Sequence, residues 1–256
     1  MSTYNRRGMA ERLQHFFAHP KVQRTGAAIV AKLADRVNYH VVRGMSDATV
    51  RPDVSSFAAA APWKISHDYV RDSTLALLCK EVADGGVPGA LAELGVFRGD
   101  FALLMSGYLP GRRIHLFDTF MGFDQADVAL DRHEDLVEDF IDFSSTHPSA
   151  VKQRFPNGEL VHLHIGRFPH TTDGVDETFA MVSIDADLYA PVLSGLRWFY
   201  PRLSVGGAIL VHDYNNAIFG GAKKAVREFR SESGAPVVPL ADWGGTAVLV
   251  KPGPPA

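Results

Sequence analysis

Acidic side chains stand at the ends of three short apolar runs in the chain. Asp118 follows RIHLF, Asp185 and Asp187 follow MVSI, and Asp213 follows GAILVH. If these runs are parallel strands, their carboxyl ends meet at one edge of a sheet, which is where open α/β sheets bind ligands. Carboxylates that lie close together repel one another unless a cation or a shared proton joins them. The spacing therefore predicts a crevice lined by several acids.

The same acids are candidates for binding a divalent metal ion. Asp185, Asp213 and His212, which precedes Asp213, are the candidate ligands. Oxygen-rich coordination favours Mg²⁺ or Mn²⁺, whereas an imidazole favours softer ions. His212 is also a candidate general base, because an unperturbed histidine has a pKa of about 6.5. Any one of these acids alone could equally cap a helix, so the signal is the cluster.

A glycine turn precedes these acids in the chain. In AELGVFRGDFA, Gly95 and Gly99 follow an apolar run, and Asp100 can open a helix. Glycines allow the backbone to approach a ligand closely, and free amides at a helix start attract an anionic group. Asp118 lies 23 residues after Gly95, a spacing typical of an acid that binds the hydroxyls of a ribose. The pattern is not the GxGxxG of dinucleotide-binding proteins, so the turn indicates a nucleoside site only together with Asp118.

The elements that must position these residues alternate along the second part of the chain. Short apolar runs alternate there with helical patterns, which is typical of a parallel sheet built from βαβ units. The last two runs are separated only by ADWGGT, which is too short for a crossover helix, so this pair should be antiparallel. The sequence predicts an α/β fold with helices on both faces of a seven-stranded sheet, in which five parallel strands are followed by a C-terminal antiparallel hairpin. The predicted strands are 90–94, 113–117, 161–165, 180–184, 207–211, 236–240 and 247–250.

The composition of the chain changes at residue 64. Residues 1–64 carry ten Lys and Arg against four Asp and Glu, whereas residues 65–256 carry 16 against 25. The basic arm contains an amphipathic helical pattern at 26–42, which could contact an anionic membrane surface but more commonly packs on its own domain or on a twin subunit. We therefore predict a homodimer or a higher homo-oligomer, with peripheral membrane contact as the alternative. Residues 65–256 should form one domain, whose acidic insertion at 125–145 carries an apolar stripe that begins at Leu130 and could form a lid.

Composition narrows the function classes. The 256 residues are 46% hydrophobic and 21% charged, which is typical of a globular protein and excludes a disordered or collagen-like chain. A single cysteine, Cys79, can form neither an internal disulfide nor a multi-thiolate metal site, so we expect a cytoplasmic protein. No apolar run is long enough to predict a transmembrane segment, and the start of the chain does not resemble a signal peptide. The net charge of −3 disfavours a nucleic-acid binder.

Four longer stretches are specific enough to compare with known proteins. They are ELGVFRG (93–99), LFDTFMGF (116–123), IDADLYAP (184–191) and GGAILVHDYNNAIFGGAKKAVREF (206–229). Together they resemble the macrocin O-methyltransferase (TylF-like) family, and the IDADLY and HDY stretches are more specific than the glycine turn. The resemblance implies a class I methyltransferase (Rossmann-like) fold. It also implies an S-adenosylmethionine-dependent enzyme that methylates sugar hydroxyls on macrolides, aminocoumarins or surface polysaccharides.

The resemblance implies a binding site for S-adenosylmethionine. Glu93, Gly95 and Gly99 would line the methionine end of the cofactor, and Asp118 would hold its ribose. Arg167 follows the third predicted strand, in a loop of the kind that contacts adenine. The candidate cofactor-binding residues are therefore Glu93, Gly95, Gly99, Asp118, Thr119 and Arg167.

The resemblance also assigns roles to the acids. It implies that Asp185 and Asp213 bind Mg²⁺ and that Asp187 is the general base. The macrolide and aminocoumarin enzymes have two acids at the strand end where this chain has His212 followed by Asp213. His212 is thus the candidate third ligand or an alternative base, which leaves the identity of the metal open. A bound metal could hold two neighbouring hydroxyls and lower the pKa of one, so that Asp187 needs only to accept its proton.

The predicted function is metal-assisted O-methylation of a sugar in a glycosylated small molecule or a glycan, as in antibiotic or polysaccharide biosynthesis. A catechol-type O-methyltransferase acting on an aromatic diol is the nearest alternative. Asp–Asn usually follows the fifth strand of that class, whereas here Tyr214 separates Asp213 from Asn215. A nicotinamide-dependent sugar oxidoreductase lacks support, because the chain has neither GxGxxG nor Tyr-x-x-x-Lys. His212 keeps open a noncatalytic subunit with the same fold.

Overall fold

The computed structural model describes residues 68–137, 143–216 and 218–254. The chain divides into two units, residues 1–49 and 50–256, and every described residue belongs to the second. The predictions for the basic arm 1–64, including its helix, lie outside the described residues. Among the helices in the described ranges, none is long and apolar enough to cross a membrane.

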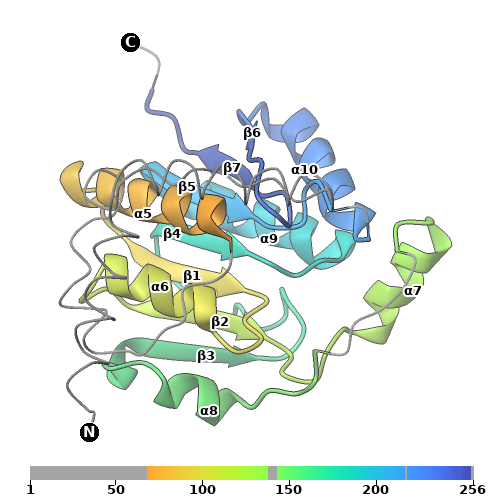
Figure 1. Ribbon diagram of the computed structural model, residues 1–256, viewed down its shortest axis with the longest axis horizontal. Helices are drawn as coiled ribbons and strands as arrows, with labels where there is room; N and C mark the ends of the chain where they lie inside the picture. The colour runs from red at the N-terminus through yellow and green to blue at the C-terminus, as the bar shows by residue number, and fades with distance from the viewer. Residues whose placement is uncertain (1–67, 138–142, 217, 255–256) are drawn as a thin grey trace, which may run out of the picture. The chain divides into compact units, whose positions relative to one another are not determined.

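A seven-stranded sheet forms the centre of the described unit (Figure 1). Its strands are β1 (Ala90–Leu94), β2 (Ile114–Asp118), β3 (Val161–Ile165), β4 (Phe179–Ile184), β5 (Leu203–Val211), β6 (Val238–Pro239) and β7 (Ala247–Val250). They lie in the order β3-β2-β1-β4-β5-β7-β6. Strands β1 to β5 are parallel, and β7 is antiparallel to both of its neighbours, β5 and β6. This confirms the predicted five parallel strands and the terminal antiparallel hairpin.

The predicted and observed strands differ most toward the C-terminal part of the sheet. β5 begins at Leu203 rather than at residue 207, because Leu203 already pairs with β4. β6 is only Val238–Pro239, whereas the sequence predicts a strand over 236–240. Pro239 has no backbone N–H to donate to a neighbouring strand, which limits the length of this edge strand.

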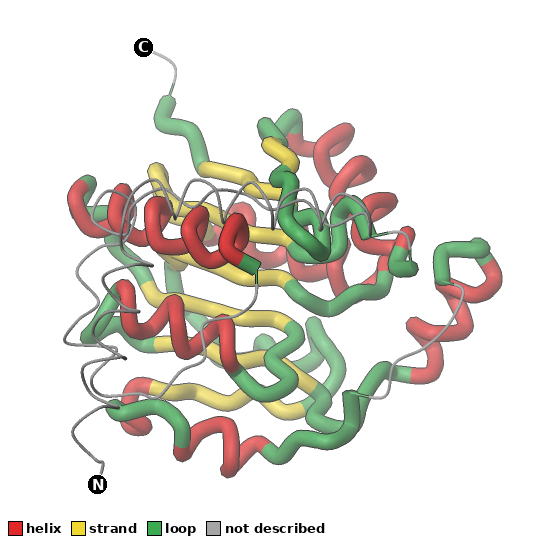
Figure 2. Tube along the Cα trace, in the orientation of Figure 1, coloured by secondary structure: helices red, strands yellow, loops and turns green. Residues whose placement is uncertain are grey.

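Helices cover both faces of the sheet, as predicted (Figures 1 and 2). One face carries α5 (Tyr69–Asp84), α6 (Asp100–Tyr108) and α8 (Pro148–Gln153), and the other carries α9 (Tyr189–Arg202) and α10 (Gly220–Ser233). The remaining helix, α7 (Gln125–His133), stands beyond the carboxyl edge of the sheet, and a short 3₁₀ helix, η1 (Gly158–Leu160), leads into β3.

Two apolar clusters fill the space between the sheet and its helices. Leu91 of β1 and Met181 of β4 belong to the cluster under α5 and α6, whereas Leu94 and Ile184 belong to the cluster under α9 and α10. Because both faces are covered, every residue of β1 and β4 is buried, and all of them except Glu93 and Ser183 are apolar. The two-sided packing fixes the carboxyl ends of the central strands in place.

Helix α7 lies inside the predicted insertion at 125–145 but buries an unexpected face. Leu130 is exposed, so the predicted apolar stripe is wrong at this position. Two of the three buried residues of α7 are instead acids, Asp127 and Asp131. Leu136, the next residue of the predicted stripe, is half-buried, and the remaining two, Phe140 and Ile141, lie outside the described residues. Carboxylates on the inner face of a helix indicate specific polar partners, because burying an unpartnered charge is costly.

Candidate active site

A cavity of about 430 Å³ opens at the carboxyl edge of the sheet. Nine of the ten site residues predicted from the sequence line it, and Gly99 is the exception. The topology explains their meeting, because the strand order reverses between β1 and β4, and open α/β sheets bind ligands at such a switch point. The nine residues are Glu93, Gly95, Asp118, Thr119, Arg167, Asp185, Asp187, His212 and Asp213.

Gly95 brings the turn after β1 against the end of β4. Its φ of +81° lies in the left-handed region, and a Cβ atom there would lie 2.0 Å from the carbonyl oxygen of Asp185. Only glycine fits such a close approach of two backbones. Gly99 serves instead as the N-cap residue of α6, where it packs against Val151 rather than in the cavity wall.

Asp118 holds the glycine turn in place. Its Oδ2 accepts hydrogen bonds from the backbone amides of Val96 and Phe97 at 2.6 and 2.9 Å, and its Oδ1 accepts a third, at 2.6 Å, from the loop after β2. Thr119 donates its hydroxyl to the carbonyl oxygen of Gly122 at 2.5 Å. Both residues therefore order the loops around the cavity. The contact of Asp118 with a ribose and that of Thr119 with the cofactor stay predictions.

Glu93, near the end of β1, is buried and caps helix α6. Gly99 offers this helix no side-chain acceptor, and Glu93 Oε2 accepts a hydrogen bond from the backbone amide of Ala102 at 3.1 Å instead. Burial and the negative charge of Asp185 raise the pKa of Glu93 well above its usual range, although Arg71 opposes the shift. A cationic ligand group beside Glu93 would favour its ionised form.

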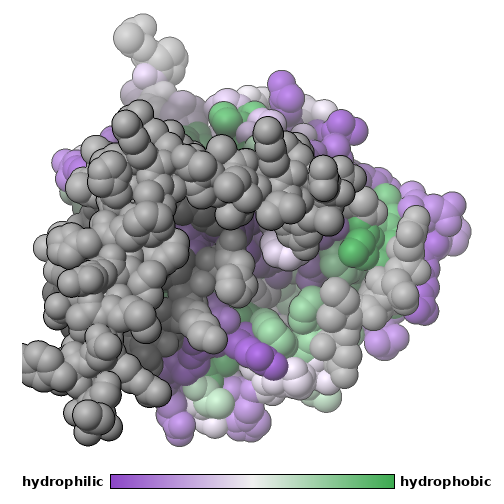
Figure 3. Space-filling view, viewed as in Figure 1, coloured by the Kyte–Doolittle hydropathy of each residue, from purple (hydrophilic) through white to green (hydrophobic). Residues whose placement is uncertain are grey.

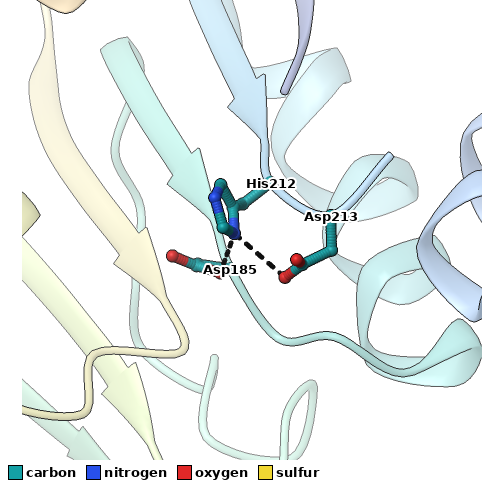
Figure 4. Close-up of side chains that lie close together, drawn as sticks. All are labelled: Asp185, His212 and Asp213. Atoms are coloured by element: carbon teal, nitrogen blue, oxygen red, sulfur yellow. Dashed lines mark hydrogen bonds and ion pairs between the residues drawn. The ribbon is translucent and has the colours of Figure 1, made fainter. Parts of the chain in front are cut away.

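Asp185, His212 and Asp213 form a compact triad at the ends of β4 and β5 (Figure 4). His212 Nδ1 lies 3.1 Å from Oδ1 of Asp185 and 2.9 Å from Oδ2 of Asp213. The other oxygen of each carboxylate has its own donor. Asp185 Oδ2 accepts a hydrogen bond from Arg71 Nη2 at 2.8 Å, and Asp213 Oδ1 accepts one from Asn216 Nδ2 at 2.6 Å. Arg71 and Asn216 thus orient the two carboxylates.

Burial and these ion pairs determine the protonation of the triad. Burial raises the pKa of Asp185, but Arg71 and His212 outweigh it and hold the pKa of that carboxyl well below its usual range. Burial lowers the pKa of His212, but the carboxylates of Asp185 and Asp213 outweigh it and raise this pKa to about 10. On these charges alone, His212 is an imidazolium at neutral pH.

Asp187 lies next to the triad in a strained backbone conformation. Its φ is +56°, a left-handed value that is uncommon for a residue other than glycine, and the residue is buried. Burial and the charges of Asp213 and Asp185 raise the pKa of Asp187 well above its usual range. A carboxylate with a raised pKa is the stronger base once ionised, which suits the role predicted for Asp187.

The triad fits a divalent cation. One ligand atom from each of its three residues lies within 4.8 Å of the others, and no other such group of His, Cys, Asp or Glu occurs among the described residues. Arg71 and Asn216 give the two carboxylates the kind of outer hydrogen-bonding support that metal ligands commonly have. Binding through Nδ1 would require His212 to lose its proton, because only the neutral imidazole can act as a ligand.

Arg167 lines the cavity, but its guanidinium is engaged with α7. Its Nε and Nη2 bind the two carboxylate oxygens of Asp127 at 3.1 and 2.5 Å, and Asp124 Oδ1 lies 3.6 Å from Nε. This forked ion pair ties the loop after β3 to α7. The predicted contact between Arg167 and an adenine ring stays a prediction.

Sequence reasoning missed Arg71, which reaches from α5 to the triad and has a side chain that is 13% exposed. Its guanidinium carbon also lies 4.1 Å from the ring centre of Phe101. A signal was present in the chain: α5 buries Leu75, Cys79 and Val82, and Arg71 lies one turn before Leu75 on the same face. A charged residue on the apolar face of a helix indicates a buried partner.

Four phenylalanines, which we call the aromatic wall, also line the cavity. They contact one another edge to face in the order Phe97, Phe143, Phe123 and Phe219, with ring centres 5.3, 5.4 and 6.2 Å apart. The four belong to separate loops, so the sequence gives no sign of their proximity. Figure 3 shows apolar surface on the same side of the molecule as α7.

Comparison with known proteins places these features in context. The family model described as macrocin-O-methyltransferase (TylF) matches residues 25–250. The demethyldecarbamoylnovobiocin O-methyltransferase of Streptomyces niveus is 30% identical over 173 residues, which are 60% of this chain and 62% of that protein. The 8-demethyl-8-(2,3-dimethoxy-α-L-rhamnosyl)-tetracenomycin-C 4′-O-methyltransferase of Streptomyces olivaceus is 27% identical over 215 residues, 77% of this chain and 80% of that protein. The chain thus spans less than two thirds of the first of these two relatives.

Solved structures of methyltransferases are also similar to this chain. The O-methyltransferase NovP has a TM-score of 0.59 and 26% identity to this chain, covering 72% of it and 80% of NovP. The calicheamicin methyltransferase CalS11 has a TM-score of 0.56 at 20% identity, covering 91% of this chain and 93% of CalS11. The second likeness concerns the fold alone. The fold predicted from the resemblance is thereby confirmed.

Proposed function

The chain belongs to the macrocin O-methyltransferase (TylF) family, and on this premise we propose that it transfers a methyl group from S-adenosylmethionine to a sugar hydroxyl. One observation carries the proposal: the glycine turn with its supporting carboxylates and the cluster of Asp185, Asp187 and Asp213 line the same cavity. The first group suits a nucleoside cofactor, and the second suits the removal of a hydroxyl proton.

Cofactor binding is supported by charge and backbone geometry. The methionine end of S-adenosylmethionine carries an ammonium and a sulfonium, and Glu93 offers a buried carboxyl group at the wall of the cavity. Asp118 and the turn at Gly95 form the adjoining part of the wall. We assign Glu93 and Gly95 to the methionine end, and Asp118, Thr119 and Arg167 to the nucleoside end. Gly99 supports the turn from outside the cavity.

The reaction is an in-line displacement at the methyl carbon. The acceptor oxygen forms a bond to this carbon while the carbon–sulfur bond breaks, and the electron pair of that bond stays on sulfur to give S-adenosylhomocysteine. The hydroxyl proton passes to a base, and we assign this role to the carboxylate of Asp187. A positioned general base typically contributes about 100-fold to 10,000-fold to the rate, and the alignment of oxygen, carbon and sulfur supplies the rest.

Asp187 suits the role of base better than His212 does. A protonated His212, donating toward Asp185 and Asp213, has no ring nitrogen free to accept a proton. A divalent cation held by the triad would orient two neighbouring hydroxyls and lower the pKa of the one that attacks. The two carboxylates favour Mg²⁺, and the imidazole favours a softer ion.

We propose that the acceptor is a glycosylated small molecule or a glycan. The two relatives described above are methyltransferases of novobiocin and tetracenomycin compounds. The aromatic wall supports an acceptor with an apolar body next to its sugar, because four adjoining aromatic rings offer a large apolar contact area. A cytoplasmic location accords with the single, buried Cys79, and a homo-oligomer stays a prediction from the basic arm.

The first experiment measures the melting temperature with S-adenosylhomocysteine and with NAD, each with and without Mg²⁺. A ligand at 100 times its Kd adds about 2.7 kcal/mol to the free energy of unfolding. We expect a rise with S-adenosylhomocysteine and none with NAD. Asp118→Asn should reduce the rise, whereas Asp173→Asn, which removes an exposed carboxylate, should not. A rise with NAD alone would overturn the proposal.

A second experiment identifies the acceptor class. The protein is incubated with S-adenosylmethionine and a panel of glycosides and aromatic diols, and mass spectrometry detects the added methyl group. We expect methylated glycosides, and we expect a chelator to suppress turnover until Mg²⁺ or Mn²⁺ is restored. Methylation of the diols alone would replace the sugar acceptor by the catechol-type alternative.

A further inference from the structure

Helix α9 begins two residues after Asp187 and has no side-chain cap of its own. Its N-cap residue is Leu188, which carries no acceptor, so the amide of Tyr189 needs a partner from elsewhere. Asp131 of α7 supplies one, because its two carboxylate oxygens lie 3.1 and 3.3 Å from the backbone nitrogen of Tyr189. The helix that follows the proposed base is thus capped by a residue 58 positions earlier in the chain.

The junction around Asp131 has no spare space. Asp131 is 1% exposed. Gly221 of α10 approaches so closely that a Cβ atom at that position would lie 2.3 Å from Asp131 Oδ2 and 2.5 Å from the nitrogen of Tyr189. Helices α7, α9 and α10 therefore meet at one carboxylate. A shift of Asp131 must move the start of α9 as well.

The strained backbone of Asp187 requires fixed neighbours on both sides. A left-handed conformation at a residue other than glycine costs roughly 1–3 kcal/mol and persists only where the surroundings determine it. On the strand side, the amide of Asp185 donates to the carbonyl oxygen of Leu94 at 2.8 Å. On the helix side, Asp131 holds the amide of Tyr189. Removing Asp131 therefore frees one side of the strained residue.

Helix α7 is itself held, so it can serve as an anchor. The forked ion pair between Arg167 and Asp127 fixes its first turn to the loop after β3. Beyond its C-terminal end, the carbonyl oxygen of Leu136 accepts a hydrogen bond from the amide of Gly220 at 2.7 Å. Asp131 lies between these two attachments.

We propose that Asp131 is a positioning residue for methyl transfer. From helix α7 it caps the start of α9, and it thereby fixes the place of Asp187 relative to Asp185 and Asp213. The inference rests on the proposed function, in which Asp187 accepts the hydroxyl proton. The competing explanation is that Asp131 only stabilises the fold. The two explanations differ in which kinetic constant changes.

The test compares Asp131→Ala with Asp131→Asn at about pH 8, where Asp131 is ionised because burial raises its pKa only to about 6. Alanine removes the acceptor, whereas asparagine keeps one oxygen for the amide of Tyr189. We expect alanine to lower kcat by about 10-fold to 100-fold, because a misplacement of about 1 Å costs up to 100-fold. The KM for S-adenosylmethionine should stay within about twofold, because the cap does not touch the cofactor half of the cavity. Asparagine should keep kcat within about threefold.

Asp135→Asn is the matched control, because it removes an exposed carboxylate from the same segment. It should leave kcat and KM unchanged. Hydrogen exchange followed by mass spectrometry gives a readout without turnover: amides at the start of α9 should exchange faster in Asp131→Ala but not in the two asparagine variants. If the alanine variant does not fold, Asp131→Ser takes its place, because its hydroxyl is too short to reach the same position, and the same pattern is expected.

Asp187→Asn separates this inference from the proposed function. If Asp187→Asn keeps turnover, the assignment of the base is wrong, whatever Asp131 does. If it loses turnover, Asp131→Ala should lower the remaining rate of the double variant little further, because Asp131 acts through Asp187. The inference is overturned if Asp131→Ala keeps kcat, if it raises the cofactor KM instead, or if both variants at position 131 lose activity equally.

Discussion

His212 sets the charge of the triad, because its ring lies between two carboxylates that would otherwise repel each other. We expect His212→Asp to bind Mg²⁺ about tenfold more tightly or better, because it replaces a cation by a third carboxylate oxygen donor. Isothermal titration calorimetry at neutral pH measures the affinity without turnover. An affinity equal to or weaker than that of the natural chain would contradict this and would indicate that the imidazole is itself a needed ligand.

Asp187→Asn should separate chemistry from cofactor binding. We expect turnover to fall by about 100-fold or more, while the Kd for S-adenosylhomocysteine stays unchanged. If turnover survives, the base lies elsewhere, and His212 becomes the next candidate.

The same variant should also melt at a higher temperature at neutral pH. Burial and neighbouring acids raise the pKa of Asp187 in the folded protein, so ionising this group opposes folding. That penalty grows as the pH rises above the unfolded value of about 3.9 and is complete above the folded pKa. Asparagine removes the penalty. A lower melting temperature in Asp187→Asn would mean that the carboxylate is stabilised by a partner instead.

Among the individual side chains of the site, the sequence predicted the acids but not the residues that bind and position them. Asp185, Asp187 and Asp213 were predictable because each follows an apolar run that must end at one edge of the sheet. Arg71 lies 114 positions before its partner Asp185, and Asp131 lies 58 positions before Tyr189. The periodicity of α5 indicates that Arg71 has a buried partner, but which residue that partner is depends on how the helices pack, and a single sequence does not give this.

Among the elements, strands were more predictable than the helix outside the sheet. The bounds of β1, β3 and β7 agree with the prediction. β1 and β7 are short, largely apolar runs between turn residues, whereas β3 is an edge strand in which apolar residues alternate with His162 and His164. α7 was predicted as part of an apolar lid, yet it buries Asp127 and Asp131. The inner face of α7 is buried through ion pairs and a capping contact, and a pattern of hydrophobic residues does not reveal such polar contacts.

The loop between β6 and β7 packs directly against His212. A Cβ atom at Gly244 would lie 2.1 Å from Nε2 of that histidine. We expect Gly244→Ala to displace the imidazole from both carboxylates, so the pKa of His212 should fall from about 10 toward its usual value, as NMR titration would measure. Turnover should fall by about tenfold or more.

Gly253→Ala, after the end of β7, is the control for this substitution, because its added Cβ would meet only Val205, at 3.6 Å. We expect it to leave both the His212 titration and turnover unchanged. If Gly244→Ala also left the titration unchanged, the loop would not be what holds the ring in place.

For the molecule as a whole, we expect stability to fall in mild acid because of His115 on β2. This residue is buried, and its Nδ1 lies 3.0 Å from Nε2 of His164. Burial first, and then the charges of His164 and His162, lower the pKa of His115 to about 4. The unfolded chain takes up a proton below about pH 6.5, whereas the folded chain does so only near pH 4. The free energy of unfolding should therefore fall by about 3 kcal/mol across this window.

Urea unfolding at several pH values between neutrality and about pH 4 measures this loss. His115→Gln, which cannot titrate, should lose stability less steeply than the natural chain over the same range. The difference between the two slopes of unfolding free energy against pH gives the contribution of His115, because the carboxylates contribute equally to both proteins. Parallel slopes would contradict the assignment.

The architecture was predictable as a whole because it depends on few features. Five short runs, all but the third and fourth of them separated by helices, form the parallel part of the sheet, and the short link between the last two runs requires a hairpin. The site follows from the same arrangement, since the strand order reverses between β1 and β4. The aromatic wall does not follow, because its four rings come from separate loops whose shapes depend on local contacts.

The meeting of three helices at Asp131 bears on how enzymes of this family can be re-engineered. A natural strategy for changing the acceptor is to graft the 125–145 segment of one enzyme into another as an exchangeable cassette. A graft that carries Asp131 would then need glycine at position 221 of the recipient, because a side chain at position 221 leaves no room for the carboxylate. A chimaera without this glycine should bind the new acceptor and still fail to methylate it.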